Sequence, residues 1–291
     1  MPLRVLPAYA AAIILWASAF PAIRVGLESF DPFHLSMLRL LVGSTALVIA
    51  AAATKMKLPE RKDLPAILIL GFLGFSVYHT FLSIGEKTVS AGAASFLVST
   101  TPLLSALLAR LFLKETFGTY GWAGSVTALF GVFLISFDAG GGFSLELGVL
   151  MIVTAALGES VYFVLQSNYL TKYGFIPFTT YTIWAGTLFM LISTPGAAEA
   201  VQQASMESLL TVLYLGLFPT VIPYFAIAYA TSKQGASEAT SSLYLTPVLA
   251  IIISWVWIGE TPTLLSIAGG VIVLAGVSVS TLYTGKGKEE K

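Results

Sequence analysis

The chain aligns with itself without a gap when it is shifted by 145 residues. The paired positions are Pro32 and Phe33 with Pro177 and Phe178, Leu70 and Gly71 with Leu215 and Gly216, Thr101 and Pro102 with Thr246 and Pro247, Glu115 and Thr116 with Glu260 and Thr261, and Gly124 and Gly131 with Gly269 and Gly276. Solenoid repeats have much shorter periods, of about 20–50 residues. The long period therefore indicates that one ancestral unit was duplicated and fused.

Composition places both copies in lipid. Of the 291 residues, 56% are hydrophobic and 10% are charged, and the mean hydropathy is +0.86. Soluble domains carry about 25% charged residues, so most of the surface of this chain must contact lipid. The absence of cysteine excludes a disulfide framework and a thiolate metal site.

Ten segments are long enough to cross a bilayer, whose core of about 30 Å takes about 20 apolar residues. The predicted spans are 7–27, 33–54, 64–85, 91–113 and 119–137 in the first half, and 147–171, 177–194, 208–231, 237–258 and 264–283 in the second. The first lacks the cleavage site of a signal peptide. We expect a first five-helix repeat over 1–139, a second over 146–283, and a disordered cytoplasmic tail over 284–291.

Basic residues predict the orientation. Of the 15 Lys and Arg residues, twelve fall on the N-terminal side of the predicted spans. Only Lys87 falls on the opposite side, and Arg24 and Arg39 lie within spans. Because short cytoplasmic loops are rich in Lys and Arg, both termini should be cytoplasmic. Five spans per half is an odd number, so the second repeat is inverted. Inverted repeats are typical of secondary transporters that work by alternating access.

Several short motifs resemble those of the EamA-type branch of the drug/metabolite transporter superfamily. They are Trp16 to Phe20 in the first span, Leu38 to Leu40 in the second, the Thr-Pro pairs of the fourth and ninth, and the corners Lys114 to Thr116 and Gly259 to Thr261. The resemblance covers essentially the whole chain and is strongest to the YddG-type exporters of aromatic amino acids. It implies an all-α, ten-helix carrier in the cell inner membrane that exports small organic solutes.

Glu159 is the first candidate site residue. It lies 12 residues into the sixth predicted span, hence about 18 Å deep at a rise of 1.5 Å per residue. Tyr162 and Gln166 follow on the same helical face. Polar groups at this depth usually face a cavity or a partner. Glu159 could therefore be a protonatable or substrate-binding carboxyl, or a neutral one that is hydrogen-bonded between packed helices.

His79 is the second candidate, since it is the only histidine well inside a predicted span. A neutral imidazole can both donate and accept a hydrogen bond. His79, with Tyr78 before it, therefore suits a polar ligand or a proton relay. The alternative is a packing residue.

Prolines and hydroxyls recur in equivalent spans. In the fourth and ninth spans, Ser95, Ser99 and Pro102 correspond to Thr240, Tyr244 and Pro247, and the eighth span adds Pro219 and Pro223. Matched interruptions in two halves point to a central site, so we expect these prolines to kink or gate. The alternative is that they are merely tolerated in membrane helices.

Aromatic side chains within the spans suit a ligand with an apolar body. They are Trp16, Tyr78, Tyr162, Trp184, Tyr224 and Tyr244. Some of them could instead belong to interfacial belts. For Arg24 and Arg39 we favour a structural role, as partners of Glu28, Asp31 or Glu86 or as snorkelling residues, over binding of a substrate carboxylate.

The sequence thus predicts a transporter and not an enzyme, since no Walker loop, HExxH or GxSxG motif is present. The expected substrates are amino acids with aromatic or bulky apolar side chains. The expected partners are this small molecule and the lipid bilayer, with no nucleic acid and no cofactor, and the protein is expected to be a monomer. The rival is efflux of lipophilic cations. The small multidrug carriers related to this superfamily use a glutamate in their first helix. The first repeat of this chain lacks one, because the position there that matches Glu159 of the second repeat is Ile14.

Overall fold

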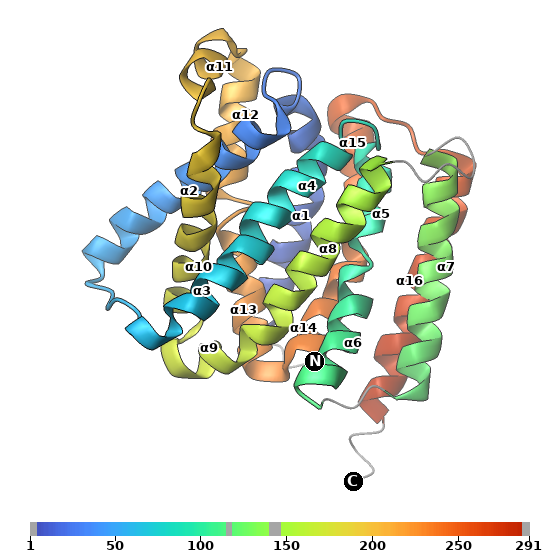
Figure 1. Cartoon of the computed structure of the whole chain (residues 1–291). Coiled ribbons are helices and arrows are strands. Elements are labelled where there is room, and N and C mark those ends of the chain that lie inside the picture. The colour runs from blue at the N-terminus through green and yellow to red at the C-terminus, as the bar shows by residue number, and fades with distance from the viewer. Residues whose placement is uncertain (1–4, 115–117, 140–146, 287–291) are drawn as a thin grey trace.

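A computed structural model describes residues 5–114, 118–139 and 147–286, and every regular element within them is a helix (Figure 1). Within a bilayer the backbone polar groups must be satisfied inside each segment, and helices achieve this. The all-helical class predicted from the sequence is confirmed.

The first half contains α1 to α7, one 3₁₀-helical segment (η2) and one π-helical segment (η3). Their bounds are α1 Leu6–Gly26, α2 Pro32–Ala53, η2 Arg61–Asp63, α3 Leu64–Gly71, η3 Phe72–Val77, α4 Tyr78–Gly85, α5 Ala91–Val98, α6 Thr101–Phe112 and α7 Thr119–Ala139.

The second half continues to Lys286. Its elements are α8 Leu147–Leu165, α9 Ser167–Tyr173, α10 Phe175–Met190, η4 Leu191–Ser193, α11 Ala197–Gln203, α12 Met206–Leu217, α13 Ile222–Gln234, α14 Ala236–Ser241, η5 Ser242–Leu245, α15 Thr246–Ile258 and α16 Leu264–Lys286.

Eight mainly helical segments of the described chain are long and apolar enough to cross a membrane. They are Leu6–Gly26, Pro32–Ala53, Arg61–Gly85, Ala91–Phe112, Leu147–Leu165, Phe175–Ser193, Met206–Gln234 and Ala236–Ile258. A shorter apolar stretch, Ile267–Gly276, lies within α16. Helix α16 packs along α7 at one edge of the bundle (Figure 1). Each of these segments overlaps a predicted span.

Capping residues explain where several helices begin. Asp31 accepts hydrogen bonds from the backbone N–H of Phe33 at 2.8 Å and of His34 at 3.2 Å, and so caps α2. Ser90 and Ser205 cap α5 and α12 in the same way. A side-chain oxygen at this position satisfies N–H groups that have no partner within the helix.

The helices of the two halves pack in matching pairs. Helix α1 packs on α13 and α15, and its counterpart α8 packs on α4 and on α5 and α6. Helix α2 packs on α12, and its counterpart α10 packs on α3. This exchange of partners is the arrangement expected for two halves related by a two-fold axis.

Glycines at the α7–α16 contact follow the same symmetry. A Cβ at Gly131 would lie 2.5 Å from the carbonyl oxygen of Gly269, and a Cβ at Gly276 would lie 2.5 Å from that of Gly124. These residues pair at the offset of 145, and small residues allow such close approach of two backbones.

The predicted prolines all lie at or beside helix interruptions. Pro102 and Pro247 occupy the first turns of α6 and α15, after breaks in the fourth and ninth predicted spans. Pro219 lies between α12 and α13, and Pro223 lies in the first turn of α13. Proline suits a first turn because the N–H it lacks has no helical partner there.

A further interruption carries no proline. Residues Phe72–Val77 form a π-helical segment in the third predicted span. Shifted by 145, this segment falls on 217–222, where α12 gives way to α13. Both halves therefore interrupt the same helix at the same place, and π-helical turns are frequent at functional sites.

The chain segments at the repeat boundaries lie partly outside the described residues. Residues 140–146, at the boundary between the two predicted repeats, and Glu115 lie outside the described residues. Helix α16 continues to Lys286, into the predicted tail, and residues 287–291 lie outside.

Candidate substrate-binding site

Two small cavities lie side by side in the centre of the bundle and share Trp16, Phe20 and Tyr78. The first, of about 20 Å³, is lined by these and by Ser95, Val98, Ser99, Thr101, Glu159, Leu243 and Thr246. The second, of about 10 Å³, is lined by the shared residues and by Ala19, Ile23, Arg39, His79 and Leu82. A single water needs about 10–15 Å³, so the cavities as they stand have room for water but not for an organic solute.

Glu159 of α8 faces the first cavity and is 2% exposed. Its Oε2 accepts a hydrogen bond from Thr101 Oγ1, and its Oε1 accepts one from the Tyr224 hydroxyl, both at 3.2 Å. The carboxyl group thereby joins α8 to α6 and α13. Both alternatives for this residue are visible in one arrangement, since the group lines a cavity and is hydrogen-bonded between helices.

Aromatic rings form the wall behind Glu159. Tyr224 lies 4.5 Å from Phe75, 5.2 Å from Trp16 and 5.9 Å from Tyr162, measured between ring centroids. Trp16 donates its indole N–H to the carbonyl oxygen of Pro219 at 3.1 Å, in the break between α12 and α13. Trp16 lines both cavities, whereas Tyr162 packs behind Tyr224 and lines neither.

His79 of α4 lines the second cavity and is 1% exposed. Neither ring nitrogen has a hydrogen-bond partner among the described residues. The neighbouring rings are Tyr78 at 5.1 Å and Phe75 and Tyr224 at 6.1 Å. Buried polar groups are usually hydrogen-bonded, so the imidazole has an unused capacity at the cavity.

Arg39 of α2 also lines the second cavity, a placement that the sequence reasoning did not favour. It is 2% exposed, so it does not snorkel, and no ion pair of the described residues includes it. Its Nε donates to Thr220 Oγ1 at 3.1 Å. The expected pairing with Glu28, Asp31 or Glu86 is therefore not found.

The remaining candidates divide into two groups. Ser95 and Ser99 line the first cavity, and their hydroxyls donate to backbone carbonyl oxygens of Gly92 and Ser95 within the same helix segment. Tyr244 and Gln166 are buried but line neither cavity. The side-chain amide of Gln166 has no hydrogen-bond partner among the described residues. Gln166 lies in the break between α8, which ends at Leu165, and α9.

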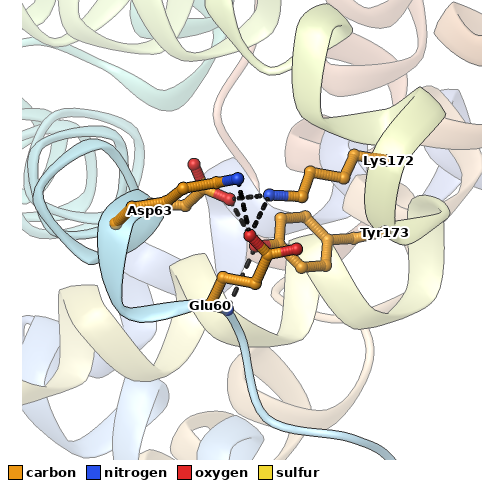
Figure 2. A network of polar contacts seen from close by, with 5 residues as sticks. Glu60, Asp63, Lys172 and Tyr173 are labelled. Carbon is orange, nitrogen blue, oxygen red and sulfur yellow. Dashed lines mark hydrogen bonds and ion pairs between the residues drawn. The ribbon is translucent and has the colours of Figure 1, made fainter.

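Glu60, Asp63, Lys172 and Tyr173 form a cluster of polar contacts (Figure 2). Lys172 Nζ lies 2.5 Å from Asp63 Oδ2 and 2.9 Å from Glu60 Oε2, and the Tyr173 hydroxyl donates to Asp63. Hydrogen bonds from Lys62 and Lys172 lower the pKa of Glu60, and hydrogen bonds to Asp63 and Glu60 raise the pKa of Lys172. The cluster joins the start of the third predicted span to the end of the sixth.

A second set of polar contacts lies at the opposite end. Arg24 Nε lies 3.4 Å from Glu260 Oε1, and Arg24 Nη1 donates to the backbone oxygen of Glu86 at 2.5 Å. Glu260 precedes the start of α16 and could have capped that helix. Instead, its Oε2 accepts from the backbone N–H of Ala91, at the start of α5. Both ends of the bundle are thus tied by polar contacts around the central cavities.

Known proteins share this architecture along the whole chain. A solved crystal structure, 21% identical, superposes with a TM-score of 0.73 and covers 96% of this chain and 98% of its own. The uncharacterized transporter YdfC of Bacillus subtilis is 58% identical over 94% of this chain and 89% of its own length. A probable terminal-alkyne amino-acid exporter of Streptantibioticus cattleyicolor is 37% identical over 91% and 89%.

The family comparison matches both halves of the chain. Residues 5–137 and 146–282 each match the EamA-like transporter family. With the apolar helices, this makes the protein a multi-pass membrane transporter and not an enzyme. The chain belongs to the EamA-like transporter family.

Proposed function

We propose that this transporter exports amino acids with aromatic or other bulky apolar side chains. The observation that carries the proposal is a buried carboxyl group, Glu159, at a cavity walled by Trp16, Phe20 and Tyr78. A carboxylate can bind an ammonium group, and aromatic walls bury an apolar body. The relative named as a probable amino-acid exporter supports the same substrate class.

The proposed membrane arrangement has ten spans in two inverted repeats, with both termini in the cytoplasm. It adds α7 and α16, of 21 and 23 residues, to the eight long apolar segments. The matched packing of α1 with α13 and of α8 with α4 supports the two-fold relation. Helix α9, which contains Lys172, and the start of α3, which follows Lys62 in the chain, lie at the end of the bundle where α1 begins and α16 ends (Figure 1). Basic residues in such short loops favour the cytoplasm.

Reporter fusions test this arrangement. Fusions after Lys57 and Lys172 should report the cytoplasm, and fusions at Gly141 and Glu199 the opposite side. If Gly141 and Lys172 report the same side, the repeats are not inverted.

In alternating access, the helix bundle would open at one end at a time, and the two small cavities would widen to admit the substrate. The substrate would contact the cavity-lining candidates directly, namely Trp16, Tyr78, His79, Ser95, Ser99 and Glu159. Tyr162, Gln166 and Tyr244 would reach it only in an opened state. The breaks at Pro102, Pro219, Pro223 and Pro247 would serve as hinges, since a few residues at element ends can absorb such a motion.

Efflux of lipophilic cations is the second candidate. It is favoured by the same pairing of Glu159 with aromatic walls, because a cation also gains from ring faces. Measuring transport of amino acids and of a lipophilic cation into proteoliposomes distinguishes the two candidate functions. Phenylalanine and tryptophan should be transported faster than glycine and glutamate. Transport of tetraphenylphosphonium with indifference to phenylalanine would replace the proposal with drug efflux.

A further inference from the structure

Arg39 is buried and makes no direct ion pair among the described residues, although the buried carboxyl group of Glu86 is near enough to interact with it electrostatically. Among the described residues no carboxylate lies within ion-pair distance of it, and its one hydrogen bond goes to the neutral hydroxyl of Thr220. A guanidinium keeps its charge in proteins, and an unpaired buried charge is costly. A site of this kind is completed by an anion.

The second cavity supplies the place for that anion. Arg39 and His79 both line it, and both ring nitrogens of His79 lack hydrogen-bond partners among the described residues. A guanidinium matches a carboxylate with two parallel N–H donors, and an imidazole N–H can add a third. Two polar side chains from different helices, α2 and α4, therefore meet at one small cavity whose other walls are mostly apolar and aromatic.

The geometry points to a carboxylate subsite in the second cavity, where Arg39, assisted by His79, binds the α-carboxylate of the substrate. The inference rests on the proposed function and deepens it. Tyr78 lines both cavities, so once the bundle opens and the two cavities widen, a ligand that filled both would extend from Arg39 to Glu159. It would place its carboxylate at Arg39, its ammonium at Glu159 and its side chain against the aromatic wall. The protein would thereby select zwitterions over amines.

Three probes that share one ring test the subsite on the purified full chain. L-phenylalanine has both charged groups, phenethylamine lacks the carboxylate, and 3-phenylpropionate lacks the ammonium. The wild type should bind phenylalanine about 10- to 100-fold more tightly than phenethylamine, the usual value of a charge-assisted hydrogen bond. Arg39→Gln should weaken phenylalanine and 3-phenylpropionate by a similar factor and leave phenethylamine within about twofold.

Arg39→Lys is the conservative variant, since it keeps the charge but loses the fork of donors. It should bind phenylalanine with an intermediate affinity. If Arg39→Gln does not fold, the wild-type comparison and Arg39→Lys still decide. Equal binding of phenylalanine and phenethylamine by the wild type overturns the subsite, and so does equal weakening of all three probes by Arg39→Lys.

Failure of the proposed function looks different. Folded wild-type protein that binds none of the three probes overturns both the amino-acid proposal and the subsite. Binding of phenethylamine with no gain from the carboxylate overturns the subsite alone and favours the cation carrier.

Discussion

Gly131 in the first half lies against the carbonyl oxygen of Gly269, and Gly276 in the second lies against that of Gly124. The two contacts match, because Gly131 and Gly276, like Gly124 and Gly269, are 145 residues apart. The charged side chains at the cavities have no such match. The position equivalent to Arg39 is Trp184, and the position equivalent to Glu159 is Ile14. The halves agree in their packing and differ in their cavity chemistry. The contact between α7 and α16 requires the same close approach of backbones at two symmetric places. A substrate without two-fold symmetry instead requires the two halves to present different side chains to it.

The largest effect is expected where the halves agree. Gly131→Ala and Gly276→Ala each place a Cβ about 2.5 Å from a backbone oxygen, and overpacking of this kind costs about 1–3 kcal/mol. Thermal unfolding in detergent should show equal drops in Tm for the two variants. Gly118→Ala is the control, since a Cβ there has no heavy atom within 4 Å. A drop in only one of the two variants would break the symmetry.

Glu159 and Ile14 test the difference between the halves. Glutamine at 159 keeps the shape but accepts at only one oxygen, so one of the two hydrogen bonds is altered. The initial export rate of phenylalanine should fall by at least about tenfold, as for loss of one charge-assisted contact. Ile14 is 53% exposed, and Ile14→Ala should leave the rate nearly unchanged. Glu159→Gln protein with wild-type transport at every pH would make the carboxyl structural and exclude proton coupling through it.

The next smaller effect is expected at Tyr78, another position at which the halves differ, since its equivalent in the second half is Pro223. The ring of Tyr78 lines both cavities. Tyr78→Ala removes a ring contact worth about 0.5–1.5 kcal/mol beyond area burial. The preference for phenylalanine over glycine should narrow by about 2- to 10-fold. Tyr78→Phe should keep the preference. An unchanged ratio in Tyr78→Ala would place the aromatic side chain of the substrate elsewhere.

The smallest effect is expected at the exposed cluster around Lys172. The pKa of Glu60 is lowered, so its contribution is present above the ordinary value of 4.5 and is lost as the pH falls. The pKa of Lys172 is raised, so its contribution is present below 10.5 and is lost as the pH rises further. Lys172→Met should therefore lower Tm slightly at pH 7 and less at pH 4. Lys233→Met, at a lysine outside the ion pairs of the described chain, is the control. An equal loss at both pH values would assign the effect to packing.

The lengths of the apolar runs and the positions of the prolines were enough to predict the apolar helices and most of the breaks within them. The spans follow from the length of apolar runs, and Pro219 and Pro247 mark interruptions because proline lacks an N–H. The π-helical segment Phe72–Val77 was missed, since its residues carry no such mark. Its signal was the repeat itself, because the offset of 145 places it on the break at Pro219.

The cavity residues were harder to predict, because helical spacing shows which residues share a face but not what the face contacts. Tyr162 shares the face of Glu159, yet its ring packs on Gly74 and Tyr224. Gln166 leaves that face because the helix ends before it. The sequence interpretation gave Arg39 a structural role. Its enclosure became visible only in the structure, where α2 packs against α4 and α12 and buries the side chain.

His79 and Tyr224 occupy equivalent positions, 145 residues apart, and their rings lie in contact at 6.1 Å. In an ancestral pair of identical five-helix chains, the residue at this place would have met a copy of itself. Every mutation there would have changed both sides of the contact at once. Fusion into one gene removed that restriction, because each position could then mutate alone. An imidazole beside a phenol is a combination that a self-paired ancestor could not have encoded.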